Sequence, residues 1–256
     1  AASSKPRPDR IRAARAGAGA VTAKSCSTEP RAGHPNPTVL PWGAGLINAV
    51  GLSNPGASAE RAILSAARAG LRPLGVPLIA SIHGQSVTAF AQAARNIAEA
   101  APDFLELNIS CPNVEAEFGR PFALDATAAA AVTAAVRPLF GGPLLVKLSP
   151  NAPNLVEIGR AVAAAGADAL TAVNTLGPGM LIDVRARRPV LANQVGGVSG
   201  PALFPIALRC VCELASAVDL PIIGTGGVAS GADALAMVMA GATAVGLGSA
   251  LYAEGV

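Results

Sequence analysis

Short apolar runs alternate with alanine-rich stretches along most of this chain. The apolar runs predict strands over residues 18–24, 77–82, 104–109, 143–148, 167–174, 220–224 and 244–248. The alanine-rich stretches predict helices over residues 87–101, 126–140, 154–165, 202–217 and 232–240. Pro- and Gly-rich segments predict a loop up to Gly56 and another up to Gly200. The alternation is typical of parallel α/β proteins, in which each helix returns the chain to the start of the next strand.

Ala-Gly-Ala sequences at residues 16–18, 165–167 and 240–242 lie at or just before a predicted strand, where glycine suits a helix C-cap and a short turn. Repeated βα units form either an open doubly wound sheet or a closed barrel. No Gly-x-Gly-x-x-Gly sequence opens a helix after the first predicted strand, which disfavours a dinucleotide-binding sheet. We therefore predict an α/β fold, a TIM (β/α)8 barrel, as a single domain over residues 1–256. Residues 1–4 would be the remnant of its first strand, so we expect it to be trimmed at the N-terminal strand and the C-terminal helix.

The composition argues against several classes of protein. Hydrophobic residues make up 52% of the 256 residues and charged residues only 14%, which excludes a disordered chain. The net charge is +3, and the Lys and Arg residues form no basic stripe interleaved with aromatics, so we expect no nucleic-acid partner. No apolar run reaches the roughly 18 residues that a membrane span needs, so we expect no membrane association.

The cysteines do not have the spacing of a metal site or a disulfide scaffold. Cys26, Cys111, Cys210 and Cys212 form no Cys-x-x-Cys pair, and neither histidine has metal-ligand spacing around it. A chain of this size also needs no disulfides for stability. We therefore expect no metal site and a location in the reducing cytoplasm.

One segment, Leu-Glu-Leu-Asn-Ile-Ser-Cys-Pro-Asn at residues 105–113, combines a buried strand with polar residues at its end. Pro112 cannot continue a strand ladder, so Asn108, Cys111 and Asn113 lie at or just beyond the carboxyl end. Ligands bind at this end of the strands in parallel α/β proteins. The thiol is therefore a candidate base or nucleophile beside a planar polar ligand. The segment alone leaves open a buried structural cysteine next to turn-forming asparagines.

Further polar residues follow the other predicted strands. They are Lys24 and Ser25, Lys147, Asn174 and Thr175, and, in the loop after the strand at residues 18–24, Asn48. A lysine that ends an apolar strand is costly unless it meets an anion, a polar ligand or solvent, and a lysine reaching the barrel mouth is the simpler alternative. The asparagines could be turn residues, or they could together form a hydrogen-bonding cage for a planar polar ring.

Glycine clusters follow the last two predicted strands. The first is Gly-Thr-Gly-Gly at residues 224–227, and the second is Gly-Leu-Gly-Ser at residues 246–249. Barrel enzymes bind phosphate at these two loops, because glycine lets the backbone N–H groups approach the ligand closely. Glycine is also common at ordinary turns between strand and helix, so either cluster alone is weak evidence for a phosphate site.

Together these residues resemble class 1 dihydroorotate dehydrogenases, the flavin mononucleotide (FMN) enzymes of pyrimidine biosynthesis. The resemblance runs from about Ala18 to Tyr252. The motifs that carry it are Glu106-Leu-Asn-Ile-Ser-Cys-Pro-Asn113, Val146-Lys-Leu-Ser-Pro150, Asn174-Thr-Leu-Gly-Pro-Gly-Met180, Gly196-Gly-Val-Ser-Gly-Pro201 and Pro221-Ile-Ile-Gly-Thr-Gly-Gly227. Each motif alone is less specific than the set.

The resemblance implies a role for each site residue. Cys111 takes the position of the catalytic base, and Lys147 lies beside the flavin and offsets negative charge that grows on it. The residues implied to bind dihydroorotate and orotate are Asn48, Asn108, Asn113, Asn174 and Thr175. The residues implied to hold FMN are Lys24, Ser25, Asn108, Lys147, Gly200, Gly226, Gly227, Gly248 and Ser249.

The resemblance also implies partners and leaves rivals. The stretch 177–189 looks more like the NAD-linked subclass, in which a separate iron–sulfur flavoprotein subunit passes electrons to NAD. The family resemblance as a whole implies a homodimer. Dihydropyrimidine dehydrogenases share much of the pattern but typically read Cys-Pro-His where this chain reads Cys111-Pro112-Asn113. A catalytically inactive flavin-binding barrel, or a phosphate-binding barrel without flavin, is the other alternative. A phosphate-binding barrel would not need the amides or the thiol.

Overall fold

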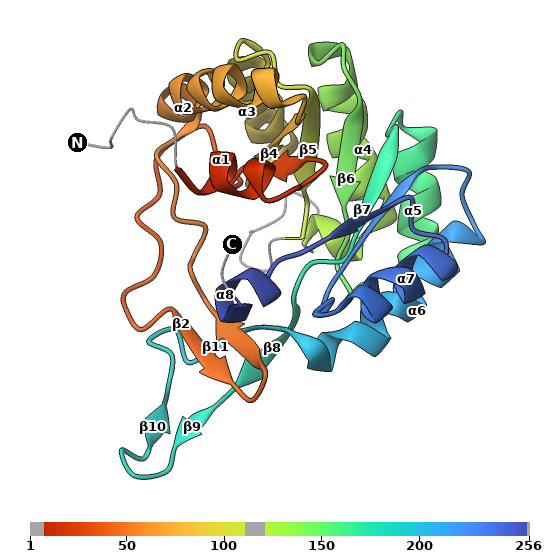
Figure 1. Cartoon of the computed structure of the whole chain (residues 1–256). Helices are drawn as coiled ribbons and strands as arrows, with labels where there is room; N and C mark the ends of the chain where they lie inside the picture. Colours follow the sequence, from red (N-terminus) through yellow and green to blue (C-terminus); the bar gives the residue numbers. More distant parts are fainter. Residues whose placement is uncertain (1–7, 111–120, 255–256) are drawn as a thin grey trace.

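A seven-stranded parallel sheet forms the centre of the protein. We describe residues 8–110 and 121–254 of a computed structural model. The strands follow one another around the sheet in the order β1 (Val21–Thr22), β4 (Leu78–Ile82), β5 (Phe104–Asn108), β6 (Leu144–Lys147), β7 (Ala169–Ala172), β12 (Ile222–Thr225) and β13 (Ala244–Gly246) (Figure 1). All seven predicted strands are confirmed, although each is shorter than its apolar run or shifted from it. In the described part of the chain, the edge strands β1 and β13 are not paired with each other.

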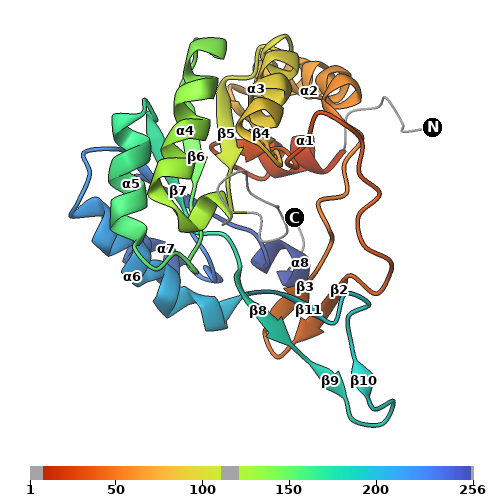
Figure 2. The ribbon, with the colours of Figure 1, turned by 180° about the vertical axis from the view of Figure 1, so that it is seen from behind.

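Helices cover the outer side of this curled sheet (Figures 1 and 2). They are α2 (Ala57–Leu71), α3 (Val87–Ala98), α4 (Ala126–Val136), α5 (Leu155–Ala164), α6 (Phe204–Ala215) and α7 (Gly231–Met239). Short 3-10 turns at η1 (Arg72–Leu74), η2 (Phe122–Leu124), η3 (Arg137–Leu139) and η4 (Pro201–Leu203) adjoin them, and α8 (Ala250–Glu254) follows β13. Parallel strands in chain order with helices outside are the arrangement of a TIM-like α/β barrel, which confirms the expected fold class.

The period of two along the strands separates an apolar layer from a polar interior. Leu105 and Leu107 of β5 are fully buried in the apolar core, whereas Glu106 and Asn108 alternate with them and make hydrogen bonds to Ser81 of β4 and to Ser25. The strand is therefore apolar toward the helices and polar toward the inside of the barrel. The polar side chains that concern function lie on this inner face.

Glycines end three helices as the Ala-Gly-Ala sequences predicted. Gly17 follows α1 (Pro8–Arg15), Gly166 follows α5 and Gly241 follows α7, with φ angles of 98°, 99° and 107°. Only glycine adopts this backbone region without strain, so each helix stops there and the chain turns at once toward the next strand.

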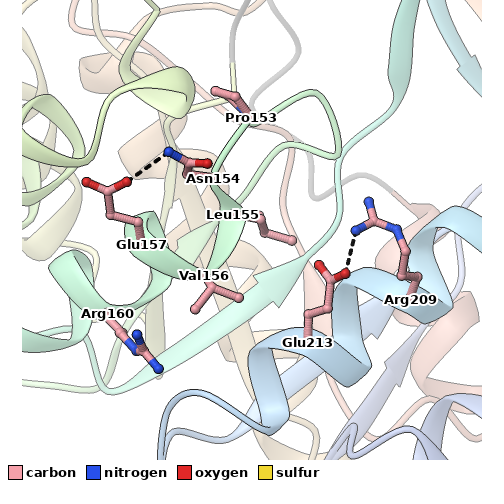
Figure 3. Close-up of a pocket in the computed structure, with 8 residues that line it drawn as sticks. All are labelled: Pro153, Asn154, Leu155, Val156, Glu157, Arg160, Arg209 and Glu213. Atoms are coloured by element: carbon pink, nitrogen blue, oxygen red, sulfur yellow. Dashed lines mark hydrogen bonds and ion pairs between the residues drawn. The ribbon is translucent and has the colours of Figure 1, made fainter.

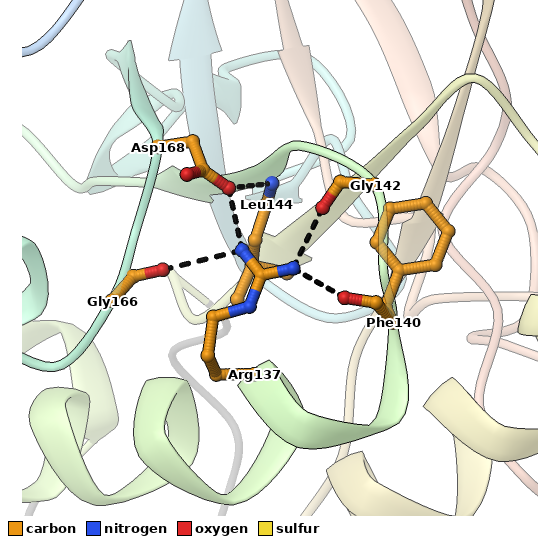
Figure 4. Close-up of polar contacts among 6 residues, drawn as sticks. All are labelled: Arg137, Phe140, Gly142, Leu144, Gly166 and Asp168. Carbon is orange, nitrogen blue, oxygen red and sulfur yellow. Dashed lines mark hydrogen bonds and ion pairs between the residues drawn. The ribbon is translucent and has the colours of Figure 1, made fainter.

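A cluster around Arg137 ties together the amino ends of two strands, on the edge opposite the predicted site (Figure 4). The guanidinium donates to the carbonyl oxygens of Phe140, Gly142 and Gly166 and pairs with Asp168. Asp168 Oδ2 also accepts from the Leu144 amide at 2.7 Å. Because these segments lead into β6 and β7, the cluster stabilises the barrel wall.

The prediction of two long loops was wrong in part, because both segments contain strands. They contribute a four-stranded antiparallel sheet in the order β2 (Val39–Trp42), β3 (Gly45–Asn48), β11 (Val195–Ser199) and β8 (Leu176–Met180), and a hairpin of β9 (Ile182–Asp183) and β10 (Arg188–Pro189). Both project from the barrel (Figures 1 and 2). Helices α1 and α2 were also not predicted. The expected strand remnant at residues 1–4 lies outside the described residues.

Candidate active site

The sequence-predicted residues from the later strands meet around a cavity of about 210 Å³ at the carboxyl ends of the strands. Those that line it are Lys147, Asn174, Thr175, Gly226, Gly227, Gly248 and Ser249. Ser199 and Thr225 line it as well, and sequence reasoning missed them. Each lies directly before a predicted glycine, Gly200 or Gly226, so adjacency was the only signal. Strands β6, β7, β12 and β13 therefore build one site.

Hydrogen bonds join the amides beside this cavity to Ser25, which follows β1. Asn174 Nδ2 donates to Asn108 Oδ1 at 3.3 Å, and Asn108 Nδ2 donates to Ser25 Oγ at 3.0 Å. Asn174 Oδ1 accepts from the backbone N–H of Thr175 at 2.8 Å. The fold thus brings together residues that follow or end β1, β5 and β7.

Lys147 is the last residue of β6 and is half-buried where it lines the cavity. Its backbone carbonyl accepts from Ser110 Oγ at 2.8 Å, which links the end of β6 to the segment after β5. Ser110 is the last described residue before position 111. The predicted residues Cys111 and Asn113 lie outside the described residues.

Asn48 and Lys24 lie apart from the cavity lining. Asn48 was expected in a loop, but it is the last residue of β3. Its Nδ2 donates to the Gly197 carbonyl at 3.3 Å. The hydrogen bonds of the described residues do not connect Asn48 to Asn108 or Asn174. Lys24 is exposed just beyond β1 and beside Ser25.

The two glycine clusters differ in what surrounds them. Gly227 has φ +75°, and a Cβ there would come within 2.6 Å of the Gly200 carbonyl and the Phe204 amide, so glycine permits two backbones to touch. A Cβ on Gly248 would meet nothing within 4 Å, although this residue lines the cavity. Glycine at 248 therefore leaves open space that a side chain would enter, which suits a ligand held by backbone.

Buried titratable groups lie next to the site but outside its lining. Burial is the main cause that lowers the His83 pKa to about 4, with help from the charges of Lys24 and Arg31. Burial likewise raises the Cys26 pKa to about 12, and the Glu60 carboxylate adds to this effect. At neutral pH Cys26 is a thiol and His83 is uncharged, so neither is a base of the described site.

A larger hollow of about 520 Å³ lies between α5 and α6 (Figure 3). Four of its polar side chains form pairs: Asn154 donates to Glu157, and Arg209 pairs with Glu213. None of the predicted site residues lines it. Size alone does not make it the site, because it lacks the convergence of strand ends.

The described residues show neither a metal centre nor a membrane-crossing helix. They contain no group of three or more His, Cys, Asp or Glu side chains that could hold a metal ion. None of the helices placed there combines the length and apolarity that a membrane crossing requires.

Comparison with known proteins gives one consistent result. The family model for dihydroorotate dehydrogenase matches residues 9–256. A Methanothermobacter thermautotrophicus protein named dihydroorotate dehydrogenase B (NAD(+)), catalytic subunit, is 46% identical over 241 residues, 94% of this chain and 78% of the relative. Proteins of the same name from Bacillus pumilus and Alkaliphilus oremlandii are 45% and 44% identical, covering 91% of this chain and 74% and 76% of their own lengths. The resemblance found in the motifs is thereby confirmed, and the chain belongs to the dihydroorotate dehydrogenase family.

Proposed function

We propose that this chain is the catalytic subunit of an NAD-linked enzyme that oxidises dihydroorotate to orotate. Its family membership assigns dihydroorotate dehydrogenase activity in pyrimidine biosynthesis, and the names of its relatives point to the NAD-linked subclass. The observation that carries the proposal to these residues is the hydrogen-bonded pair of amides, Asn108 and Asn174, beside the cavity that Lys147 lines.

The cavity has the chemical character that FMN needs. Amide and ammonium groups from β5, β6 and β7 would face the polar edge of a flavin ring, and the loops after β12 and β13 offer the backbone of Gly226, Gly227, Gly248 and Ser249 to a phosphate. The open space beside Gly248 supports this fit. We assign Lys24, Ser25 and Gly200 to the same site as flavin contacts. Bound FMN would supply the hydride acceptor that the oxidation requires.

The proton chemistry falls to Cys111. We propose that its thiolate removes a proton from C5 of dihydroorotate while hydride leaves C6, so that the C5–C6 bond becomes the double bond of orotate. The thiolate becomes a thiol in this step. A thiolate is the reactive form, so the site must lower the pKa of this thiol or exclude water when it acts.

The amides and Lys147 hold and polarise the reactants. Asn108, Asn174 and Thr175, together with Asn48 and Asn113, would bind the ring and carboxylate of the substrate by hydrogen bonds. Lys147 would stabilise the negative charge that develops on the electron-accepting side of the site, where a preorganised charge contributes most to the rate.

We further propose that electrons leave through another polypeptide. The relatives are named as catalytic subunits, and the four cysteines of this chain lack the spacing of an iron–sulfur site. An iron–sulfur flavoprotein subunit that passes electrons to NAD, bound to a homodimer of this chain in the cytoplasm, fits this arrangement.

The test of the base is anaerobic reduction of FMN-loaded protein by dihydroorotate, followed by the loss of flavin absorbance. Wild type should bleach rapidly, whereas Cys111→Ala should bleach slower by a factor on the order of 100 to 10,000. The bleaching rate of Cys111→Ser should lie between those of wild type and Cys111→Ala and should rise at high pH. A hydroxyl is a weaker acid than a thiol, so its deprotonated form is populated only at higher pH. Equal rates for wild type and Cys111→Ala would contradict the assignment of the base. If wild type and variants all bind flavin but dihydroorotate reduces it in none of them, an inactive flavin-binding barrel would be favoured.

A further inference from the structure

Glu106 is buried inside the barrel beneath the two amides and accepts hydrogen bonds at both oxygens. It is 3% exposed and lies two residues before Asn108 on β5, so the two side chains share the inner face. Ser81 Oγ donates to its Oε1 and Thr171 Oγ1 donates to its Oε2, both at 2.9 Å. The role proposed above for Asn108 and Asn174 does not explain this carboxylate.

The carboxylate fixes the direction of the hydrogen bonds that lead to the site. Ser81 has a single hydroxyl hydrogen and gives it to Glu106, so in its 2.9 Å contact with Ser25 it must accept. Ser25 therefore uses its own single hydrogen on Ser81. The Ser25 oxygen is left as an acceptor for Asn108 Nδ2 at 3.0 Å.

This order sets the orientation of both amides. Asn108 must turn its NH2 group toward Ser25 and its carbonyl oxygen toward Asn174, whose Nδ2 donates to it. The far end requires the same orientation, because Asn174 Oδ1 accepts from the Thr175 backbone N–H, which can only donate. Every bond in the chain from Glu106 to Thr175 thus has one allowed direction.

We propose that Glu106 is a positioning residue that, together with the Thr175 backbone N–H at the other end of the chain, holds the orientation in which the Asn108 amide presents its N–H group to the substrate. The inference rests on the proposed function, in which Asn108 and Asn174 contact dihydroorotate. Each amide nitrogen carries a second hydrogen, so the ordered chain presents two N–H donors to oxygen atoms of the bound ring. A rotated Asn108 amide would place an acceptor against those oxygens and weaken binding.

The variant Glu106→Gln keeps the size of the side chain but introduces an NH2 group that can donate to Ser81, and the two ends of the chain would then require opposite orientations of Asn108. Ser81→Ala interrupts the chain while Glu106 stays in place, so it tests the proposal even if the first variant folds poorly. Thr171→Val is the matched control, because it removes one donor from Glu106 on the side that does not lead to the amides.

The measurement is orotate affinity by calorimetry on FMN-loaded protein, with flavin content, thermal midpoint, KM and kcat determined alongside. Glu106→Gln and Ser81→Ala should each weaken orotate binding on the order of 10- to 100-fold and raise KM more than they lower kcat. Thr171→Val should stay within about threefold of wild type. This difference between the first two variants and Thr171→Val identifies a changed amide orientation as the cause of the weaker binding, because a general loosening of the barrel would affect all three variants.

Two results would overturn the inference while wild type binds orotate. One is wild-type affinity in Ser81→Ala, and the other is a loss in Thr171→Val as large as in Glu106→Gln. Absence of orotate binding by wild type itself would overturn the proposed function, and this inference with it.

Discussion

Asn108 and Lys147 are register partners at the ends of the neighbouring parallel strands β5 and β6. Residues paired in this way have their side chains on the same face of the sheet, so the fold sets an amide and an ammonium group side by side at the barrel mouth. Asn108 makes its hydrogen bonds to Ser25 and Asn174, while Lys147 lines the cavity. Substrate orientation and charge stabilisation would therefore come from adjacent strands.

Removal of the Lys147 charge should slow chemistry far more than it affects the fold. Lys147→Met keeps the apolar stem but removes the ammonium group, so we expect anaerobic flavin reduction by dihydroorotate to slow on the order of 100- to 1,000-fold. Arg160→Met, which removes an equal charge from an exposed position on α5, is the control. Comparable rates for the two variants in single-turnover kinetics would argue against Lys147 as a catalytic group.

The two glycine clusters should respond differently to alanine. Gly227→Ala forces a side chain into φ +75° and against the backbone of Gly200 and Phe204, so we expect a loss of more than about 2 kcal/mol in the free energy of unfolding. Gly248→Ala meets no protein atom within 4 Å, so its thermal midpoint should match wild type while FMN affinity falls on the order of tenfold. Denaturant unfolding and flavin titration separate these effects. Unchanged FMN affinity in Gly248→Ala would contradict the placement of the ligand.

Acid should destabilise the protein partly through His83. Its folded pKa of about 4 lies below the ordinary 6.5, so the unfolded state binds the proton first as the pH falls. The stabilisation is present above pH 6.5, is lost between pH 6.5 and 4, and amounts to at most about 3 kcal/mol. Urea midpoints at pH 7 and pH 5 should therefore differ less in His83→Gln than in wild type. An unchanged difference in His83→Gln would contradict this role of His83.

When native protein is treated with iodoacetamide at pH 8, the rate at which each thiol is labelled should follow its exposure to solvent. Cys212 is exposed and should react, whereas Cys26 and Cys210 are fully buried, with pKa values raised mainly by burial. Peptide mass mapping after labelling reports each site separately. Fast labelling of Cys26 in the folded protein would contradict its burial.

Because burial raises the Cys26 pKa from 9.0 to about 12, the free energy of unfolding should decline above about pH 9, where the unfolded state releases the Cys26 proton before the folded state does.

The parallel sheet could be predicted because its signal is local. Each central strand is an apolar run bounded by turn residues, and barrel topology then places consecutive runs side by side. The same logic placed Asn108 and Lys147 at strand ends. Helix α2 could also have been found, since its buried Ile63, Leu64, Ala67 and Leu71 follow a helical spacing.

The antiparallel sheet could not be predicted in this way. Strand β11 reads Val-Gly-Gly-Val-Ser, which has weak strand propensity, and it pairs with β3 through contacts such as that between Asn48 and Gly197, 149 residues apart. The polar chain behind the site was hidden for the same reason. Alternation marks Glu106 as inward-facing, but only the fold shows that Ser81 and Thr171 are its partners.

The most direct test of the central claim compares two reductants on the same FMN-loaded protein without oxygen. Dihydroorotate carries the carboxylate that the amide-lined site is proposed to bind, whereas dihydrouracil lacks it. The account predicts rapid flavin bleaching and stoichiometric orotate with dihydroorotate, and no bleaching on that timescale with dihydrouracil. Bleaching by dihydrouracil alone would contradict the account and assign the site to a dihydropyrimidine dehydrogenase reaction.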